Sequence, residues 1–243
     1  MIINKFDVPF KVVCDFDGTI SKNETFDQLL ERYADPHWQN IEADWLNGKI
    51  GTGECMSKQM ALVNVEKAEL DNFLSRIQID INFVRFVKFC KSLNIEVSIA
   101  SDGVDYLIKS ILKNYKIDSL NFASNKLIFK DNNKYQLEFK KKTDLCDSGS
   151  MVCKCSVVQG LKNNKKIIYV GDGFSDLCVS NHVDLVIAKS SLLAHCIKNK
   201  LPHYPFYDFS DVQSIVKNLI KNKNIIESRR TEKERVFFKN LNS

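Results

Sequence analysis

Two hydrophobic periodicities alternate along this chain, and their alternation restricts the possible folds more than any other feature. Short apolar runs, typical of buried strands, are followed by apolar residues spaced three or four apart, which is typical of helices. Because strands separated by helices pair in parallel, we expect a doubly wound α/β fold with helices on both faces of a parallel sheet. The predicted strands are residues 10–14, 95–100, 120–124, 166–170 and 184–188. Residues 127–129 and 135–139, on either side of Asp131-Asn132-Asn133, predict an additional hairpin.

One long segment interrupts the alternation. Residues 22–80 carry four apolar stripes at helical spacing and no predicted strand, and Gly48, Gly51 and Gly53 break the set in its middle. A chain of 243 residues has room for one α/β domain and a small insert. We therefore expect three parts: a Rossmann-like core of residues 1–21 and 81–220, an inserted α-helical cap of residues 22–80, and a basic tail of residues 221–243.

The charge distribution argues against a nucleic-acid partner. The chain carries 35 Lys and Arg against 30 Asp and Glu, a net charge of +5. Seven basic and three acidic residues lie in residues 221–243, so the tail accounts for +4 and the rest is nearly neutral. No basic face is therefore expected on the core. If the tail bound an anionic surface, deleting it would abolish a salt-dependent interaction.

The apolar segments also predict where the protein resides. No apolar run approaches the roughly 20 residues that a membrane-spanning helix needs. The first residues lack the long apolar stretch of a secretory signal, so we expect a cytoplasmic monomer or homodimer without a membrane partner. In that compartment the eight cysteines are expected as reduced thiols.

Three of these cysteines invite a zinc interpretation. Cys146, Cys153 and Cys155 are separated by seven and two residues, and no histidine is close to them in the sequence. Tetrahedral zinc needs four ligands, commonly with two cysteines spaced by two to four residues. We therefore favour packing cysteines or a redox-sensitive pair.

Acidic residues follow the first predicted strand directly. Asp15 and Asp17 are two residues apart and precede Gly18 and Thr19. If the chain leaves the strand in a tight turn, the two carboxylates converge, and a hard cation such as Mg²⁺ relieves their repulsion by taking oxygen ligands. Gly18 permits a bound group to approach the backbone closely. An ordinary polar turn is the alternative interpretation.

Further polar groups follow the other strands. Ser101 and Asp102 come after the strand at 95–100 and precede a helix, which is typical either of a phosphate site or of an N-cap serine. Asp172 and Asp176 follow the strand at 166–170. Lys154 opens a helix, where its charge opposes the helix dipole unless it faces anions. Ligands bind beyond the carboxyl ends of parallel strands, so we expect these groups to meet.

The order Asp-x-Asp, Ser, Lys, Gly-Asp-x-x-x-Asp resembles the haloacid dehalogenase-like hydrolases, in their phosphatase branch, from about Lys11 to Ala188. The resemblance implies that Asp15 is the nucleophile and forms an aspartyl-phosphate, with Asp17 as general acid and base. It also implies a phosphatase that hydrolyses a small-molecule phosphomonoester.

The resemblance extends to a metal and to the phosphate. It implies Mg²⁺ held by the Asp15 carboxylate, the Asp17 backbone carbonyl and the Asp172 carboxylate. It further implies that phosphoryl oxygens are held by Ser101 and Lys154, assisted by the N–H groups of Gly18 and Asp102. Asp176 is expected to orient Lys154 or a metal-bound water.

Two subgroups of the family are similar to this chain. The position of the helical insert and the spacing through Glu24 match phosphoserine phosphatases, in which that acid contacts the substrate amino group; a glutamate at a helix start is also favoured by the dipole. Those proteins carry an arginine in the third cap helix, whereas residues 54–60 offer only Lys58. Residues 101–108 and 123–125, the predicted hairpin, and Cys146 with residues 153–154 look like the methionine-salvage enol-phosphate phosphatases and the phosphocholine/phosphoethanolamine phosphatases.

The substrate therefore stays open between an enol phosphate, a phosphocholine-like or phosphoethanolamine-like compound, and phosphoserine. Two other functions are compatible with the same motifs. A phosphotransferase would pass the phosphoryl group to an alcohol, and a phosphate-binding interaction protein would keep the fold without turnover. The presence of Asp17 argues against a phosphate-binding protein without turnover, because loss of this acid is the simplest way to abolish catalysis.

Overall fold

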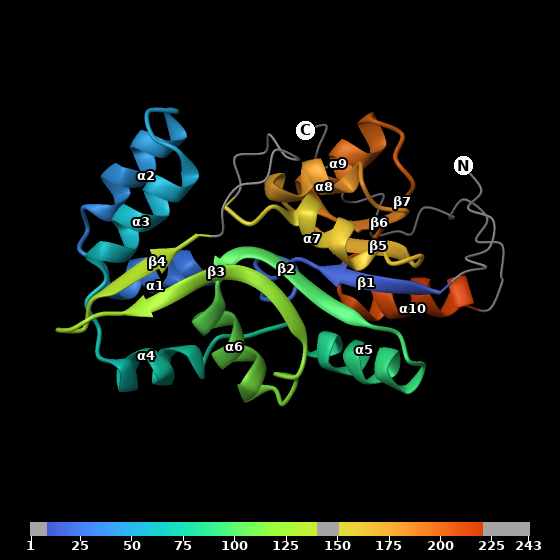
Figure 1. Cartoon of the computed structure of the whole chain (residues 1–243), viewed down its shortest axis with the longest axis horizontal. Coiled ribbons are helices and arrows are strands. Elements are labelled where there is room, and N and C mark those ends of the chain that lie inside the picture. Colours follow the sequence, from blue (N-terminus) through green and yellow to red (C-terminus); the bar gives the residue numbers. More distant parts are fainter. Residues whose placement is uncertain (1–8, 140–150, 221–243) are drawn as a thin grey trace.

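A seven-stranded sheet forms the centre of the molecule. The computed structural model describes residues 9–139 and 151–220, and in these residues the strand order is β4-β3-β2-β1-β5-β6-β7 (Figure 1). All neighbouring strands pair in parallel except β4, which is antiparallel to β3. The strands are β1 (Phe10–Cys14), β2 (Val97–Val104), β3 (Asn121–Phe129), β4 (Tyr135–Glu138), β5 (Lys166–Gly171), β6 (Leu185–Ala188) and β7 (His203–Pro205).

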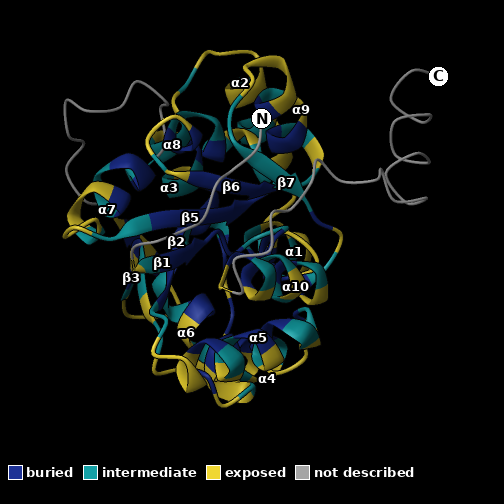
Figure 2. Ribbon diagram, turned by 90° about the vertical axis from the view of Figure 1, so that its right-hand side faces the viewer, coloured by how far each residue is buried: buried dark blue, intermediate teal, exposed yellow. Residues whose placement is uncertain are grey.

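Successive side chains of each strand point to opposite faces, so apolar strands require helices on both sides. In β5, Ile168 and Val170 join one cluster of buried residues, whereas Ile167 and Tyr169 join another. Figure 1 shows α5 (Ile81–Ser92), α6 (Asp105–Asn114) and α10 (Phe209–Ile220) on one side of the sheet. On the other side lie α7 (Lys154–Leu161), α8 (Leu177–Ser180) and α9 (Ser190–Lys198). The predicted doubly wound α/β fold is confirmed, and the central strands are buried (Figure 2).

Four helices are inserted between β1 and α5, as the sequence predicts. They are α1 (Thr25–Tyr33), α2 (Trp38–Leu46), α3 (Thr52–Leu62) and α4 (Lys67–Leu74). The chain leaves and rejoins the core at one place, because Ser21 and Ile79 form an antiparallel bridge. The amide of Lys22 donates to the Gln78 carbonyl at 3.2 Å, and the amide of Asp80 donates to the Ile20 carbonyl at 2.9 Å.

The inserted helices share a hydrophobic core with the sheet. Leu29, Leu30 and Leu70 belong to the same buried cluster as Val12 and Ile99 of the central strands. The β3–β4 hairpin also contacts the insert, since the Tyr135 hydroxyl donates to the Val65 carbonyl at 2.6 Å. The helices are therefore packed onto the core at several points besides their two connections.

Three details differ from the predictions. The short edge strand β7 was not predicted. Gly53 lies inside α3, so it does not interrupt the helices as expected. Strand β2 continues through Ser101 to Val104 with an irregular register, and Val104 is the N-cap of α6, so the N-cap interpretation of Ser101 is wrong. The predicted tail of residues 221–243 and Cys146 lie outside the described residues.

Candidate active site

The central strand β1 lies at the point where the chain reverses its direction across the sheet. It is flanked by β2 on one side and β5 on the other, and ligands bind at the carboxyl ends of strands at such a point. The Asp15 amide donates to the Val170 carbonyl at 2.8 Å, which joins the ends of β1 and β5. The predicted residues after β1, β2 and β5 therefore meet at one edge.

The turn after β1 depends on a glycine. Gly18 has a φ of +68°, a left-handed conformation that side chains disfavour. A Cβ at this position would lie 2.6 Å from Oδ2 of Asp172, so the missing side chain leaves space for that carboxylate. Thr19 donates from Oγ1 to Oδ1 of Asp172 at 2.5 Å. The turn thus brings Asp172 of the β5 loop against the β1 loop.

Lys154 is the cation at the centre of the site. Its Nζ lies 2.9 Å from Oδ2 of Asp15 and 2.7 Å from Oδ1 of Asp176, and its side chain is 2% exposed. It also donates to Oγ of Ser175 at 2.8 Å. Burial alone lowers the pKa of Lys154, but the carboxylates of Asp15 and Asp176 outweigh it and hold that pKa above its ordinary value. Lys154 is therefore charged, and it pairs with carboxylates from two different loops.

Asp176 is fully buried and its two oxygens accept four hydrogen bonds. Oδ1 accepts from Nζ of Lys154 at 2.7 Å and from the Tyr169 hydroxyl at 2.6 Å. Oδ2 accepts from the amides of Asp172 at 3.0 Å and Gly173 at 3.1 Å. A carboxylate accommodates about four such bonds, so Asp176 has little capacity left for another ligand. It holds Lys154 and the β5 loop in place.

Three carboxylates crowd this edge of the sheet. Ligand oxygens of Asp15, Asp172 and Asp176 lie within 4.8 Å of one another. Desolvation and then the charge of Asp176 raise the pKa of Asp15, against the opposing effect of Lys154. Desolvation also raises the pKa of Asp172, although the hydrogen bond from Thr19 lowers it. The site therefore has an excess of carboxylate oxygens that a cation would relieve.

Magnesium fits the oxygens that remain. Mg²⁺ prefers hard oxygen ligands in octahedral geometry. Asp15 accepts the Phe16 amide at 2.7 Å and faces Lys154, and Asp172 accepts Thr19, so both carboxylates keep unused acceptor capacity. Asp176 does not. The hydrogen bonds thus leave acceptor capacity for a metal ion on Asp15 and Asp172 rather than on Asp176.

Asp17 connects the β1 turn to the start of α1. Its Oδ1 accepts from the Thr25 amide at 2.8 Å and from Oγ of Ser21 at 3.4 Å. Its Oδ2 lies on the side of Gly103, where an added Cβ would be only 2.8 Å away. Desolvation raises the pKa of Asp17, with the Thr25 amide opposing the shift. A carboxyl with a raised pKa is suited to exchanging a proton.

The end of β2 supplies the serine. Ser101 is buried, and its Oγ accepts from the Gly103 amide at 2.9 Å. The backbone carbonyl of Asp102 accepts a hydrogen bond from Nδ2 of Asn125 at 2.6 Å. The side-chain Oδ1 of Asp102 accepts one from the Val152 amide at 2.8 Å. These bonds fix the segment that the sequence predicted to bind phosphate.

Several positioning residues were missed by the sequence analysis. Thr19 and Ser175 lie within the acidic motifs, so their position was a usable signal. Tyr169 was interpreted only as a strand residue, and Asn125 received no separate role. Nothing in the local pattern marks the Tyr169 hydroxyl as a partner of Asp176.

A pocket opens beside the β1 turn. Its volume is about 460 Å³, and it is lined by Gly18, Lys22, Asn23, Glu24, Asp27, Gln28 and Glu31. Glu24 keeps an exposed surface at the rim, yet partial desolvation, followed by the charges of Asp17, Asp27 and Asp172, raises its pKa to about 7. Desolvation and Glu42 raise the pKa of Asp27 to about 6. The pocket wall is thus acidic.

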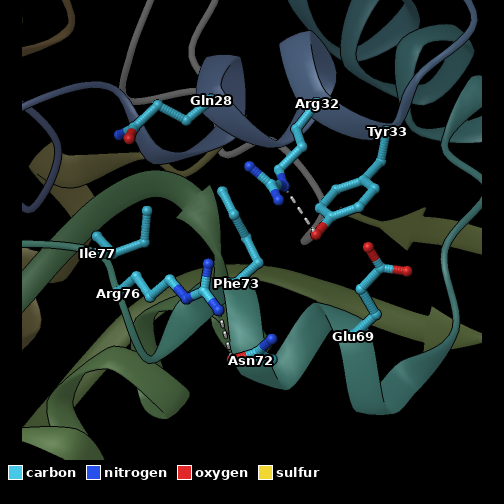
Figure 3. Close-up of a pocket in the computed structure, with 8 residues that line it drawn as sticks. All are labelled: Gln28, Arg32, Tyr33, Glu69, Asn72, Phe73, Arg76 and Ile77. Atoms are coloured by element: carbon cyan, nitrogen blue, oxygen red, sulfur yellow. Dashed lines mark hydrogen bonds between the residues drawn. The ribbon is translucent and has the colours of Figure 1, made fainter.

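A second pocket adjoins the first through Gln28, which lines both. Its volume is about 210 Å³, and it is lined by Arg32 of α1 and by Arg76, which lies just after the end of α4 (Figure 3). Nε of Arg32 donates to the Tyr33 hydroxyl at 3.0 Å, and Nη2 of Arg76 donates to Oδ1 of Asn72 at 3.4 Å. Both guanidinium groups are therefore already engaged with neighbours.

The sequence is similar to a known protein family and to named enzymes. The family model described as "Putative Phosphatase" matches residues 10–196. The chain is 30% identical to the 2-hydroxy-3-keto-5-methylthiopentenyl-1-phosphate phosphatase of Geobacillus thermodenitrificans (strain NG80-2), over 82% of this chain and 91% of that protein. The protein of the same name from Bacillus thuringiensis (strain Al Hakam) is 27% identical, over 88% and 98% respectively.

The fold also matches solved structures. A phospho-aspartyl intermediate analogue of phosphoserine phosphatase superposes with a TM-score of 0.63 and 20% identity, over 86% of this chain and 99% of that one. At this identity the likeness concerns the fold. Within residues 9–139 and 151–220, no helix combines the length and the apolar character needed to cross a membrane.

Proposed function

Because the chain belongs to the Putative Phosphatase family of the haloacid dehalogenase-like hydrolases, we propose that it hydrolyses a small phosphomonoester through an aspartyl-phosphate formed on Asp15. Its activity class is that of a phosphoric monoester hydrolase. The observation that supports this mechanism best is the 2.9 Å contact between Nζ of Lys154 and Oδ2 of Asp15. Asp176 positions the same Nζ through a contact of 2.7 Å.

In the first half-reaction, an Asp15 oxygen attacks phosphorus and the bond to the leaving alcohol breaks. Asp17 gives the departing oxygen its proton, which its raised pKa favours. In the second half-reaction, Asp17 takes a proton from water, the water oxygen attacks phosphorus, and the Asp15 carboxylate is released. One difficult displacement becomes two easier ones.

The remaining predicted residues have separate tasks in this scheme. Lys154 and the Ser101 hydroxyl hold the oxygens of the transferring group, with the N–H groups of Gly18 and Asp102. Asp15, the Asp17 carbonyl and Asp172 would hold Mg²⁺, which neutralises charge between the carboxylate and the phosphate when it is bound. Asp176 positions Lys154. Residues 22–80 act as the cap that limits access to the site.

The first substrate candidate is an enol phosphate of the kind named for the relatives. Those proteins are covered over 91–98% of their length, and the family model matches residues 10–196, which include the residues of the pocket wall. The similarity to these relatives is therefore not limited to the short motifs that handle phosphate, which supports this candidate.

The acidic pocket favours a second candidate, a phosphomonoester with an ammonium group on its leaving alcohol. Among the described residues that line the pocket, Glu24, Asp27 and Glu31 outnumber one cation, Lys22. The same acids repel the carboxylate of phosphoserine. Lys58, the cation at the place where phosphoserine phosphatases carry an arginine, is paired with Glu54 at 2.6 Å.

A panel of phosphomonoesters separates these candidates. The panel contains the methylthio enol phosphate, phosphoethanolamine, phosphocholine, phosphoserine and an aryl phosphate, each measured with and without Mg²⁺. We expect kcat/KM to be highest for one of the first three and turnover to require Mg²⁺. A preference for phosphoserine would contradict the role given to the acidic wall.

An alcohol added to the same assay tests hydrolysis against transfer. If phosphate appears on the added alcohol in place of inorganic phosphate, the enzyme is a phosphotransferase. Lack of turnover on the whole panel, with phosphate still bound, would indicate a binding protein.

A further inference from the structure

A group of sulfur and nitrogen ligands lies outside the carboxylate site. Cys155 of α7, Cys178 of α8 and His182, in the turn after α8, place their ligand atoms within 4.8 Å of one another. The sulfur atoms of Cys155 and Cys178 are 3.2 Å apart. His182 is distant from Cys155 in the sequence, and the fold brings the two residues together.

The fold itself brings these three residues together. Cys155 directly follows Lys154, and Cys178 comes two residues after Asp176, so the Lys154–Asp176 ion pair joins the two segments. Cys178 and His182 are four residues apart, and the His182 amide donates to the Val179 carbonyl at 2.9 Å, which extends the helical turn. Residues at this spacing share one face of a helix. Helices α7 and α8 lie side by side in Figures 1 and 2.

We propose that Cys155, Cys178 and His182 form a binding site for a thiophilic divalent metal, of which Zn²⁺ is the physiological choice. Thiolate and imidazole are the preferred zinc ligands, and three protein ligands leave one tetrahedral position for a further donor. The carboxylate site, by contrast, offers hard oxygens suited to Mg²⁺. The two sites therefore select different metals.

The sulfur separation fits a metal better than a disulfide. Two thiolates on one tetrahedral zinc lie about 3.8 Å apart, given Zn–S bonds of about 2.3 Å. The observed 3.2 Å requires the sulfurs to separate by about 0.6 Å for zinc. A disulfide of about 2.05 Å requires them to approach by about 1.1 Å, together with the Cβ geometry that such a bond demands.

Burial of the ligands gives the site a closed side and an open side. Cys155 is buried among apolar residues that include Val158 and Val179, whereas Cys178 is half-buried and His182 is exposed. A metal can enter past His182 while the apolar side excludes water from the Cys155 sulfur. When it is bound, it fastens α7 to α8 and thereby fixes Lys154 relative to Asp176.

Metal content and cobalt spectroscopy test the site in the full-length protein. We expect about one zinc per chain at the site, and an absorption band from thiolate-to-metal charge transfer when Co²⁺ replaces it. Carboxylates do not produce that band, so Mg²⁺-site binding is distinguished from binding at the cysteines. The proposal does not depend on which phosphomonoester is hydrolysed, or on turnover at all.

Single variants assign the ligands. The His182 side chain is exposed, so His182→Ala leaves the core intact. Cys178→Ser replaces only the sulfur by oxygen. Both variants are therefore expected to fold. Loss of a residue that hydrogen-bonds to a metal ligand typically lowers metal affinity about 10–100-fold. Loss of a ligand itself should lower the zinc affinity at least as much. Cys153→Ser is the matched control: it lies in the same segment, caps α7 through Ser156, and is outside the ligand group, so zinc binding should be unchanged.

Thermal stability provides a second readout. At free zinc about 100-fold above its dissociation constant, the unfolding midpoint of the unaltered protein should rise by about 5–10 °C, and that of His182→Ala should not respond. Zinc and cobalt signals that survive both ligand variants overturn the proposal. A chain that takes up no metal but loses two mass units on mild oxidation, dependent on Cys178, overturns it in favour of a disulfide.

Discussion

Replacing Lys154 by methionine removes the only cation that the described structure places within 3 Å of both Asp15 and Asp176. The three side chains are 2%, 8% and 0% exposed, so water cannot take the place of the ammonium group. Methionine keeps a similar length and volume, which limits the effect of a cavity. What changes is that two buried carboxylates lose the positive charge between them.

The magnitude follows from the burial. Removing one partner of a buried ion pair costs about 3–5 kcal/mol of unfolding free energy. For a protein of this size each kcal/mol corresponds to about 2–4 °C, so the unfolding midpoint should fall by about 6–20 °C. The pKa of Asp15 is already raised above 3.8 with Lys154 present, and without it the pKa rises further. The folded variant then binds protons that the unfolded chain has released.

The sign of the pH dependence follows directly. A carboxyl whose folded-state pKa is raised gives stability that is present below the unfolded value of 3.8 and is lost as pH rises towards the folded value. The loss of unfolding free energy in Lys154→Met, relative to the unaltered protein, should therefore be smaller near pH 5 than near pH 8. Urea unfolding at both pH values measures this difference in unfolding free energy. The slope m, the dependence of that free energy on urea concentration, should be the same for both proteins.

A matched surface variant provides the control. Lys126 pairs with Glu138 at 3.2 Å, and both side chains are exposed, so Lys126→Met should cost at most about 1 kcal/mol. A loss below about 1 kcal/mol for Lys154→Met, equal at pH 5 and pH 8, would refute the view that Lys154 neutralises two buried charges.

Three further outcomes are expected. Asp15→Asn keeps the shape of the side chain but removes the attacking carboxylate, so phosphate release should become undetectable while the circular dichroism spectrum is retained; EDTA should stop turnover, and Mg²⁺ alone should restore it. Gly18→Ala puts a Cβ 2.6 Å from Asp172 at a φ of +68°, so we expect a loss of about 1–2 kcal/mol in urea and a higher Mg²⁺ requirement in phosphate-release assays; unchanged values for both would argue against the described turn. For phosphoethanolamine, KM should fall as pH rises through about 7, where Glu24 ionises, and Glu24→Gln should flatten this profile without affecting an aryl phosphate; identical profiles would remove Glu24 from substrate recognition.

The positions of the central strands were accessible to sequence analysis because buried strands have a strong apolar signal. Residues 10–14 and 166–170 are short runs bounded by polar turns, and both are central strands. Strand β7 has only three residues at the sheet edge, and so short a segment has no detectable period. The end of β2 was misplaced because Ser101 satisfies the local rule for an N-cap, whereas pairing with β3 extends the strand through it.

Individual site residues were easier to predict than their mutual distances. Lys154 was conspicuous as a cation at a helix start, and its partners follow from the rule that parallel strands end at one edge. Tyr169 had no such signal, because an apolar strand pattern conceals a hydroxyl that lies 2.6 Å from Asp176. The approach of His182 to Cys155 depends on how α7 packs against α8, and helix packing is not encoded in local spacing.

The bridge between Ser21 and Ile79 has an evolutionary consequence. The inserted segment of residues 22–78 begins and ends at adjacent points of the core. Exchanging this segment between related enzymes therefore requires no change in the strand connections of the sheet. Tyr135, which holds the Val65 carbonyl, is one contact that an exchanged segment must also preserve. If this segment contacts the leaving group as proposed, its exchange would change the substrate preference and leave the residues at the strand ends in place.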